Sequence, residues 1–201
     1  DMDWTGATGQ PRFSFFEHQN FGALQFIDDM TVSGSTIRFR TDSLDTSIDT
    51  KGKYFWRSIF DGAGSWSLQD SLDVFNFEHI TGDLTTNGVN LKTRRSSFSS
   101  PNKKILDMRG SYWSLVEEPN NPASEWYVEG NTMETVLAEG STVELTGQNP
   151  TVNIRDNFSF DYLLSSNTSG NTTFTNFPEA SDSIRFHHLE LRNSAVFGGT
   201  M

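Results

Sequence analysis

Residues 153–164 read NIRDNFSFDYLL and alternate between apolar and polar side chains over most of their length. Residues 183–191 repeat the pattern. Alternation with a period of two residues places one set of side chains on each face of an extended strand, so both stretches predict half-buried β-strands. Long strands with one wet face and one dry face are typical of the antiparallel sheets of a sandwich.

Short alternating runs recur along the whole chain, separated by turn signals rich in Gly, Asn, Asp and Pro. Helical periodicity is almost absent, and the two best helix candidates, residues 66–73 and 133–139, would each span no more than about two turns. The chain is therefore expected to be all-β. We predict strands at residues 12–16, 23–27, 36–40, 54–60, 72–79, 88–92, 104–108, 111–116, 125–128, 142–145, 151–154, 158–164, 172–177 and 183–191.

Two β architectures are compatible with the predicted strands. The long alternating runs favour an antiparallel β-sandwich or jelly roll. A short motif, an apolar strand followed by Gly or Asn, recurs in the middle of the chain and is similar to the coils of a right-handed β-helix. The copies are irregularly spaced, whereas a solenoid normally keeps a steadier period, so we predict the sandwich or jelly roll and keep the right-handed β-helix as the alternative. The copies lie at residues 77–82, 106–110, 128–131 and 145–147.

The chain length predicts one domain. A sandwich or barrel can contain all 201 residues. The acidic, proline-containing segment at residues 117–124 is the best candidate for an internal boundary or a long loop, because Pro cannot continue a strand interior. We interpret residues 1–201 as a single β-rich domain with a candidate subdivision at that segment.

The composition limits the partners. The net charge of −11 repels nucleic acid and anionic membrane surfaces, so neither nucleic-acid binding nor membrane insertion is expected. The sequence contains no Cys and no apolar run of the roughly 18 residues that a membrane-spanning helix needs. Only 34% of residues are hydrophobic, and 17 of them are Phe, so part of the burial is expected to come from identical neighbours in a homo-oligomer.

The sequence shows no recognisable catalytic, metal-binding or cofactor-binding motif. The adjacent histidines His187 and His188 lie in a predicted strand, where neighbouring side chains point to opposite faces and cannot bind one ion together. Acidic pairs such as Asp28 with Asp29 diverge for the same reason. We therefore expect no enzyme, no metal and no cofactor.

Aromatic clusters are the first candidate binding feature. Three clusters place rings next to one another in predicted strands, so one ring of each can enter the core while its neighbour stays outside. An exposed Trp or Tyr can stack on a sugar or anchor a protein partner. The alternative is that the core and an oligomer interface cover both rings. The candidate platform residues are Trp56, Trp113, Trp126 and Tyr127.

A basic segment is the second candidate. It interrupts the acidic background, with Asp107 as the only acid in the interval. Such a reversal of sign can dock an acidic partner, including another copy of the chain, and fix its register. A solvated loop between strands is an equally good interpretation. The residues are Lys92, Arg94, Arg95, Lys103, Lys104 and Arg109.

The lack of Cys, the dense short strands, the abundance of Ser, Thr, Asn and Gly, the many Phe residues and the tail at residues 193–199 resemble phage tail-fibre, tailspike and other virion structural proteins. The resemblance implies trimeric assembly and attachment to a host-surface glycan or to other virion proteins. No binding residue is carried over from the family.

We therefore expect a non-enzymatic structural or adhesion module of a virion or an extracellular appendage at a cell surface. Its expected partners are copies of itself, other structural proteins of the same assembly and a surface glycan. The alternatives are a carbohydrate-active enzyme, either a polysaccharide depolymerase or a lyase, and a free-standing carbohydrate-binding module.

Overall fold

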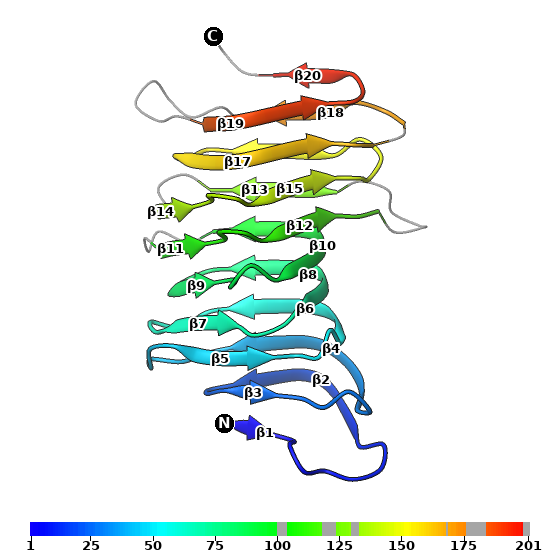
Figure 1. Cartoon of the computed structure of the whole chain (residues 1–201), viewed down its shortest axis with the longest axis vertical. Helices are drawn as coiled ribbons and strands as arrows, with labels where there is room; N and C mark the ends of the chain where they lie inside the picture. Colours follow the sequence, from blue (N-terminus) through cyan, green and yellow to red (C-terminus); the bar gives the residue numbers. More distant parts are fainter. Residues whose placement is uncertain (100–103, 118–123, 130–132, 168, 176–183, 199–201) are drawn as a thin grey trace.

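The computed structural model describes residues 1–99, 104–117, 124–129, 133–167, 169–175 and 184–198. Every regular element in these ranges is a β-strand, which confirms the all-β prediction. Figure 1 shows the strands stacked as successive coils along one axis, from the N-terminus at the bottom to β20 (Ala195–Phe197) at the top. Within the same ranges, no helix has the length and apolar character required to cross a membrane.

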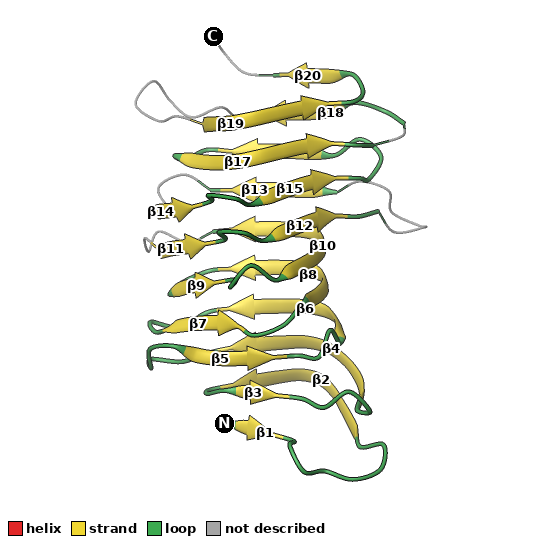
Figure 2. Ribbon diagram, viewed as in Figure 1, coloured by secondary structure: helices red, strands yellow, loops and turns green. Residues whose placement is uncertain are grey.

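The coils form two sheets, which Figure 2 shows in yellow with the connecting loops in green. The 7-stranded sheet contains, in order, β1 (Met2–Asp3), β3 (Leu24–Gln25), β5 (Thr46–Asp49), β7 (Ser65–Leu68), β9 (Asp83–Thr85), β11 (Lys104–Asp107) and β14 (Met133–Leu137). The 13-stranded sheet contains β20 together with β2 (Arg12–Asn20), β4 (Thr31–Phe39), β6 (Tyr54–Phe60), β8 (Leu72–His79), β10 (Asn90–Phe98), β12 (Tyr112–Leu115), β13 (Glu125–Val128), β15 (Thr142–Leu145), β16 (Thr151–Ile154), β17 (Phe158–Ser165), β18 (Thr172–Thr175) and β19 (Ile184–Leu191).

All strand pairs among the described residues are parallel. Leu91 of β10, for example, pairs with Leu72 of β8 in the coil before and with Trp113 of β12 in the coil after. The fold is a β-solenoid, as the alternative interpretation proposed, and the prediction of an antiparallel sandwich or jelly roll was wrong. Period-2 alternation reports that one face of a strand is buried, but it carries no information about the direction of the neighbouring strand.

Unequal connections make the coil period irregular beyond β10, whereas register partners in the coils before it lie 19 to 21 residues apart. Strand β10 is a branch point, because its first half pairs with β12 and its second half pairs with β13. In the following coils a separate segment joins the two halves, and residues 118–123 of the first such segment lie outside the described residues. The candidate subdivision at residues 117–124 falls on this segment. Pairing requires only that strands line up, so connections of any length between them are compatible with a solenoid.

Both helix candidates were wrong. Residues 66–73 contain the end of β7 and the start of β8, and residues 133–139 contain β14. A segment of about two turns gains little from its own helix propensity, so pairing with neighbouring coils decides its conformation.

The core is a continuous column of large aromatic side chains between the two sheets. Phe39 stacks on Phe60, with ring centroids 4.9 Å apart, and Phe77 meets Trp113 edge to face at 4.9 Å. Trp126 continues the contacts towards the upper coils. Each buried ring removes on the order of 150–250 Å² from water, which compensates for the low aliphatic content.

Candidate functional site

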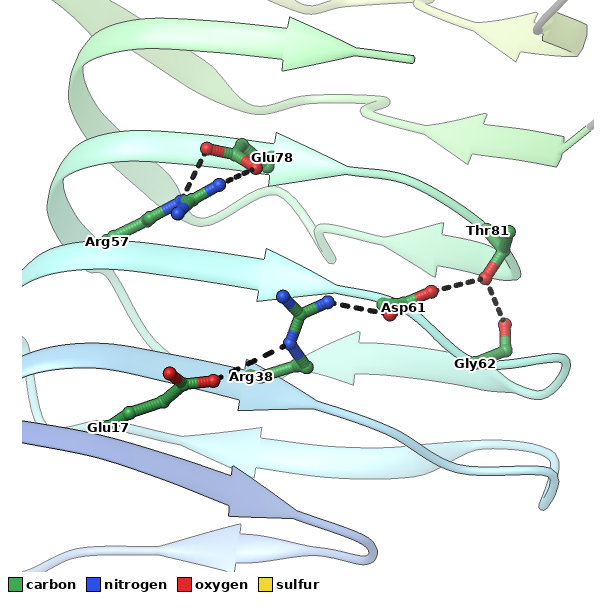
Figure 3. A network of polar contacts seen from close by, with 7 residues as sticks. All are labelled: Glu17, Arg38, Arg57, Asp61, Gly62, Glu78 and Thr81. Atoms are coloured by element: carbon green, nitrogen blue, oxygen red, sulfur yellow. Dashed lines mark hydrogen bonds and ion pairs between the residues drawn. The ribbon is translucent and has the colours of Figure 1, made fainter. Parts of the chain in front are cut away.

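The outer face of the 13-stranded sheet, the side turned away from the core, carries several paired charged side chains. Parallel in-register strands place equivalent outward residues above one another, so charged residues of successive coils form contacts along the stack. Figure 3 shows the lower part of this arrangement. Arg57 of β6 donates from Nε and Nη2 to the two carboxylate oxygens of Glu78 of β8, at 2.6 and 2.7 Å.

A second set of contacts in Figure 3 centres on Arg38 of β4. Its Nη1 donates to Asp61 Oδ2 at 2.7 Å, and its Nε lies 4.0 Å from Glu17 Oε1. Thr81 donates from its hydroxyl to the carbonyl oxygen of Gly62 at 3.0 Å and reaches Asp61 Oδ1 at 3.5 Å. Contacts between coils therefore hold these outward side chains in fixed positions.

A hollow of about 370 Å³ lies on this face over β8, β10 and β13; we call it the outer groove. Buried Phe77 and Ser96 complete its floor. Outward positions of three neighbouring coils supply the other lining residues, and the small side chain of Ser97 leaves the space between its larger neighbours. These residues are Asn76, Glu78, Arg95, Ser97, Glu125 and Tyr127.

The predicted aromatic platform is only partly at the surface. Trp56 is 47% exposed and stacks on Phe75, with ring centroids 4.0 Å apart, and Tyr127 lines the outer groove. Trp113 and Trp126 are fully buried in the core, so the prediction that they contact a ligand was wrong. Each belongs to an aromatic pair in which one ring must face inward, and period-2 alternation does not determine which one when both are aromatic.

The predicted basic patch does not form one exposed surface. Each exposed member that the structure describes lies beside a carboxylate, so little unpaired positive charge remains among them. Lys92 lies 3.5 Å from Asp73, Arg95 lies 3.7 Å from Glu125, and Arg109 lies 2.6 Å from Asp107.

The remaining members of the patch are not available for docking. Arg94 is buried with its guanidinium carbon 4.8 Å from the centroid of the Phe75 ring. Lys104 is buried and donates from Nζ to the carbonyl oxygens of Ile80 and Ser99, both at 2.8 Å. Lys103 lies outside the described residues. The prediction of a docking role for Arg94 and Lys104 was therefore wrong, because both side chains are buried.

Two buried basic groups have strongly lowered pKa values. Burial lowers the pKa of Lys104 to about 8. Burial, with the nearby positive charge of Lys104 as a second cause, lowers the pKa of His79 to about 3. The His79 Nε2 proton is donated to the carbonyl oxygen of Gly82 at 2.7 Å, and Nδ1 has no partner among the described residues. His79 is therefore neutral over the ordinary pH range.

We expect acid to destabilise the protein through His79. Between pH 6.5 and about 3, the unfolded chain binds a proton on this imidazole and the folded chain does not. The free energy of unfolding therefore falls with decreasing pH, by up to about 1.4 kcal/mol per pH unit from this group. Urea unfolding of the wild type and of His79→Gln from about pH 7 to pH 4 measures the contribution, because carboxylate titrations are common to both. Parallel curves for the two proteins would contradict the assignment.

The neighbouring histidines at the top of the solenoid have separate partners. His187 Nδ1 lies 2.7 Å from Asp161 Oδ1, which lowers the pKa of that carboxyl, and His188 stacks on Tyr162 with centroids 4.4 Å apart. Among the residues that the structure describes, no group of three or more His, Cys, Asp or Glu side chains is arranged to hold a metal ion.

Asn76, Glu78, Ser97 and Glu125 were missed in the sequence. The alternation of β8, β10 and β13 placed them on the wet face, but only the pairing of these strands brings them together. Comparisons with protein-family models, with curated proteins and with solved structures found no match in any of the three.

Proposed function

We propose that the chain is a non-enzymatic structural and adhesion module of a virion or cell-surface appendage, acting through contacts made by the outside of its solenoid. The observation that supports this most is the ordered outer face of the 13-stranded sheet. Contacts such as Arg57 with Glu78 hold its side chains before any partner arrives. A surface with fixed side chains loses less conformational entropy on binding, which favours recognition.

Exposed aromatic residues support the adhesion part of the proposal. Phe16 and Phe21 are 85% and 66% exposed, and Trp56 and Tyr54 are about half exposed. Large apolar side chains gathered on a protein surface mark contact sites for other molecules. We assign Trp56 and Tyr127 to such contacts, as the sequence predicted.

We expect the protein to self-associate, because covering exposed rings such as Phe16 and Phe21 removes apolar surface from water, and we expect a trimer because the resemblance to virion structural proteins implies one. Light scattering coupled to size-exclusion chromatography should give about three times the chain mass of 22.6 kDa. The double variant Phe16→Ser, Phe21→Ser should shift the distribution towards the monomer, whereas the matched variant Leu44→Ser, at another exposed position, should not. A wild-type chain that stays monomeric at high micromolar concentration would refute self-assembly.

Polysaccharide cleavage is the second candidate function. It is favoured by one observation: the carboxylates of Glu78 and Glu125 line the same groove. Glycoside hydrolysis uses two carboxylates on either side of the scissile bond. Release of reducing ends from a polysaccharide panel, abolished in both Glu78→Gln and Glu125→Gln, would establish an enzyme and overturn the non-enzymatic proposal.

A further inference from the structure

The outer groove contains polar groups with unused hydrogen-bonding capacity. The Asn76 amide, the Ser97 hydroxyl and the Tyr127 hydroxyl have no hydrogen-bond partner within the described part of the chain, although all three line the groove. Together they offer both donors and acceptors. A ligand that enters the groove can therefore exchange hydrogen bonds with them in place of water.

The charges of the groove are already balanced. Both guanidinium contacts of Arg57 are directed at Glu78, and Arg95 lies 3.7 Å from Glu125. An anionic ligand would meet two carboxylates, and a cationic ligand would have to compete with two guanidinium groups. This arrangement favours a ligand without net charge.

The shape and position of the groove further limit the class of ligand that it can bind. Strand pairing on both sides already engages the backbone of β10, so the sheet face cannot bind a peptide by adding it as a strand. The volume of about 370 Å³ lies near the lower end of the range for ligand pockets, about 300 to 1,000 Å³. The aromatic ring of Tyr127 beside polar groups matches a molecule with apolar C–H faces and many hydroxyls.

We propose that the outer groove binds a neutral saccharide, with Asn76 and Ser97 bonding to its hydroxyls and Tyr127 packing against a sugar ring. This inference rests on the proposed adhesion function and names its ligand class. Glu78 and Glu125 accept further hydroxyl hydrogen bonds while their arginine partners hold them in place. Binding is therefore expected to depend on groove shape and hydrogen bonds and to be nearly independent of salt.

The test uses an array of neutral and acidic oligosaccharides and a substitution that fills the groove. Ser97→Tyr places a ring over the groove floor at a position that faces away from the core. Ser47→Tyr is the matched control, because Ser47 is a half-buried outward serine of β5 in the other sheet. We expect the wild type and Ser47→Tyr to bind the same neutral members, and Ser97→Tyr and Tyr127→Ala to lose binding at least tenfold.

Three results would overturn the inference: binding of acidic members only, neutral binding that Ser97→Tyr leaves unchanged, or no binding to the array. A loss of binding between about 0.05 and 0.5 M salt would also contradict a neutral ligand. The oligomeric state of the same samples separates this failure from failure of the proposed function. A trimer that binds no saccharide would refute only the saccharide proposal. A monomer that binds no saccharide would refute both the saccharide proposal and the proposed structural and adhesion function.

Discussion

Replacement of Trp113 by Ala is expected to lower the free energy of unfolding by about 3 to 5 kcal/mol, the usual range for a buried Trp or Phe. Trp113 has no exposed surface and lies where the aromatic contacts of successive coils converge. Its ring meets Phe77 at 4.9 Å and Trp126 at 5.0 Å, and its Nε1 donates to Thr93 Oγ1 at 3.0 Å. The substitution leaves a cavity and removes the donor from a buried hydroxyl.

Trp56→Ala is the matched control for this experiment. The ring of Trp56 is about half exposed and has Phe75 as its stacking partner, so its loss should cost about 1 to 2 kcal/mol. Urea unfolding followed by circular dichroism measures both variants. Equal losses for the two variants would contradict the inward placement of Trp113.

The second large effect is expected from Gly82→Ala, which should destabilise the protein by about 2 to 5 kcal/mol. Gly82 has a φ of +76°, a conformation that side chains with a Cβ disfavour. A Cβ there would also lie 2.5 Å from the carbonyl oxygens of both Gly62 and Gly64, in the coil below, and 2.8 Å from Trp66. Backbone oxygens cannot rotate away, so the coils would have to separate locally.

Gly9→Ala provides the control for this second prediction. Gly9 has a similar φ of +86°, but a Cβ there would meet nothing within 4 Å. Its substitution therefore measures the effect of backbone strain alone. We expect a destabilisation of about 1 kcal/mol, which includes the lower conformational entropy of the unfolded chain that carries Ala. If Gly82→Ala is no more destabilising than Gly9→Ala, the close stacking of the coils at this corner is wrong.

The sequence predicted the strands better than their arrangement. Residues 158–164 were predicted as a strand and form β17, because alternation and β-propensity are local properties. The parallel stacking was not predicted, because it is decided by pairing between residues far apart, such as Leu91 with Trp113. A regular period is present in the first half of the chain, where register partners such as Arg57 and Asn76 lie 19 residues apart. Beyond β10, where most copies of the recognised motif lie, longer connections raise the spacing to 30 residues, as between Arg95 and Glu125.

The site residues illustrate the same limit. In the Tyr112–Trp113 and Trp126–Tyr127 pairs, the sequence indicated that one ring faces inward, but only the coil register selects Trp113 and Trp126. Arg94 belongs to a basic segment in the sequence, yet it lies where β10 branches and is buried beside Phe75. Asn76 and Ser97 carry no signal of their own, because the groove exists only when three coils are stacked.

The outer face is one continuous surface that advances by one strand spacing per coil. Thr36 and Thr173 are outward residues that the register connects through β4, β6, β8, β10, β13, β16 and β18. Six spacings of about 4.8 Å give about 29 Å between their Cα atoms, and the distance from Thr36 to Thr151 is one spacing shorter, about 24 Å. Because the chain has no Cys, spin labels can be attached to Cys placed at these positions alone.

Pulsed electron paramagnetic resonance on the two doubly labelled proteins, Thr36→Cys with Thr173→Cys and Thr36→Cys with Thr151→Cys, measures this advance directly. The solenoid predicts distances near about 29 and 24 Å, extended by the reach of the labels, with the Thr173 pair longer by about one strand spacing. Equal distances, or a Thr173 pair closer than about 20 Å, would show that the strands do not stack in this order and would contradict the parallel solenoid.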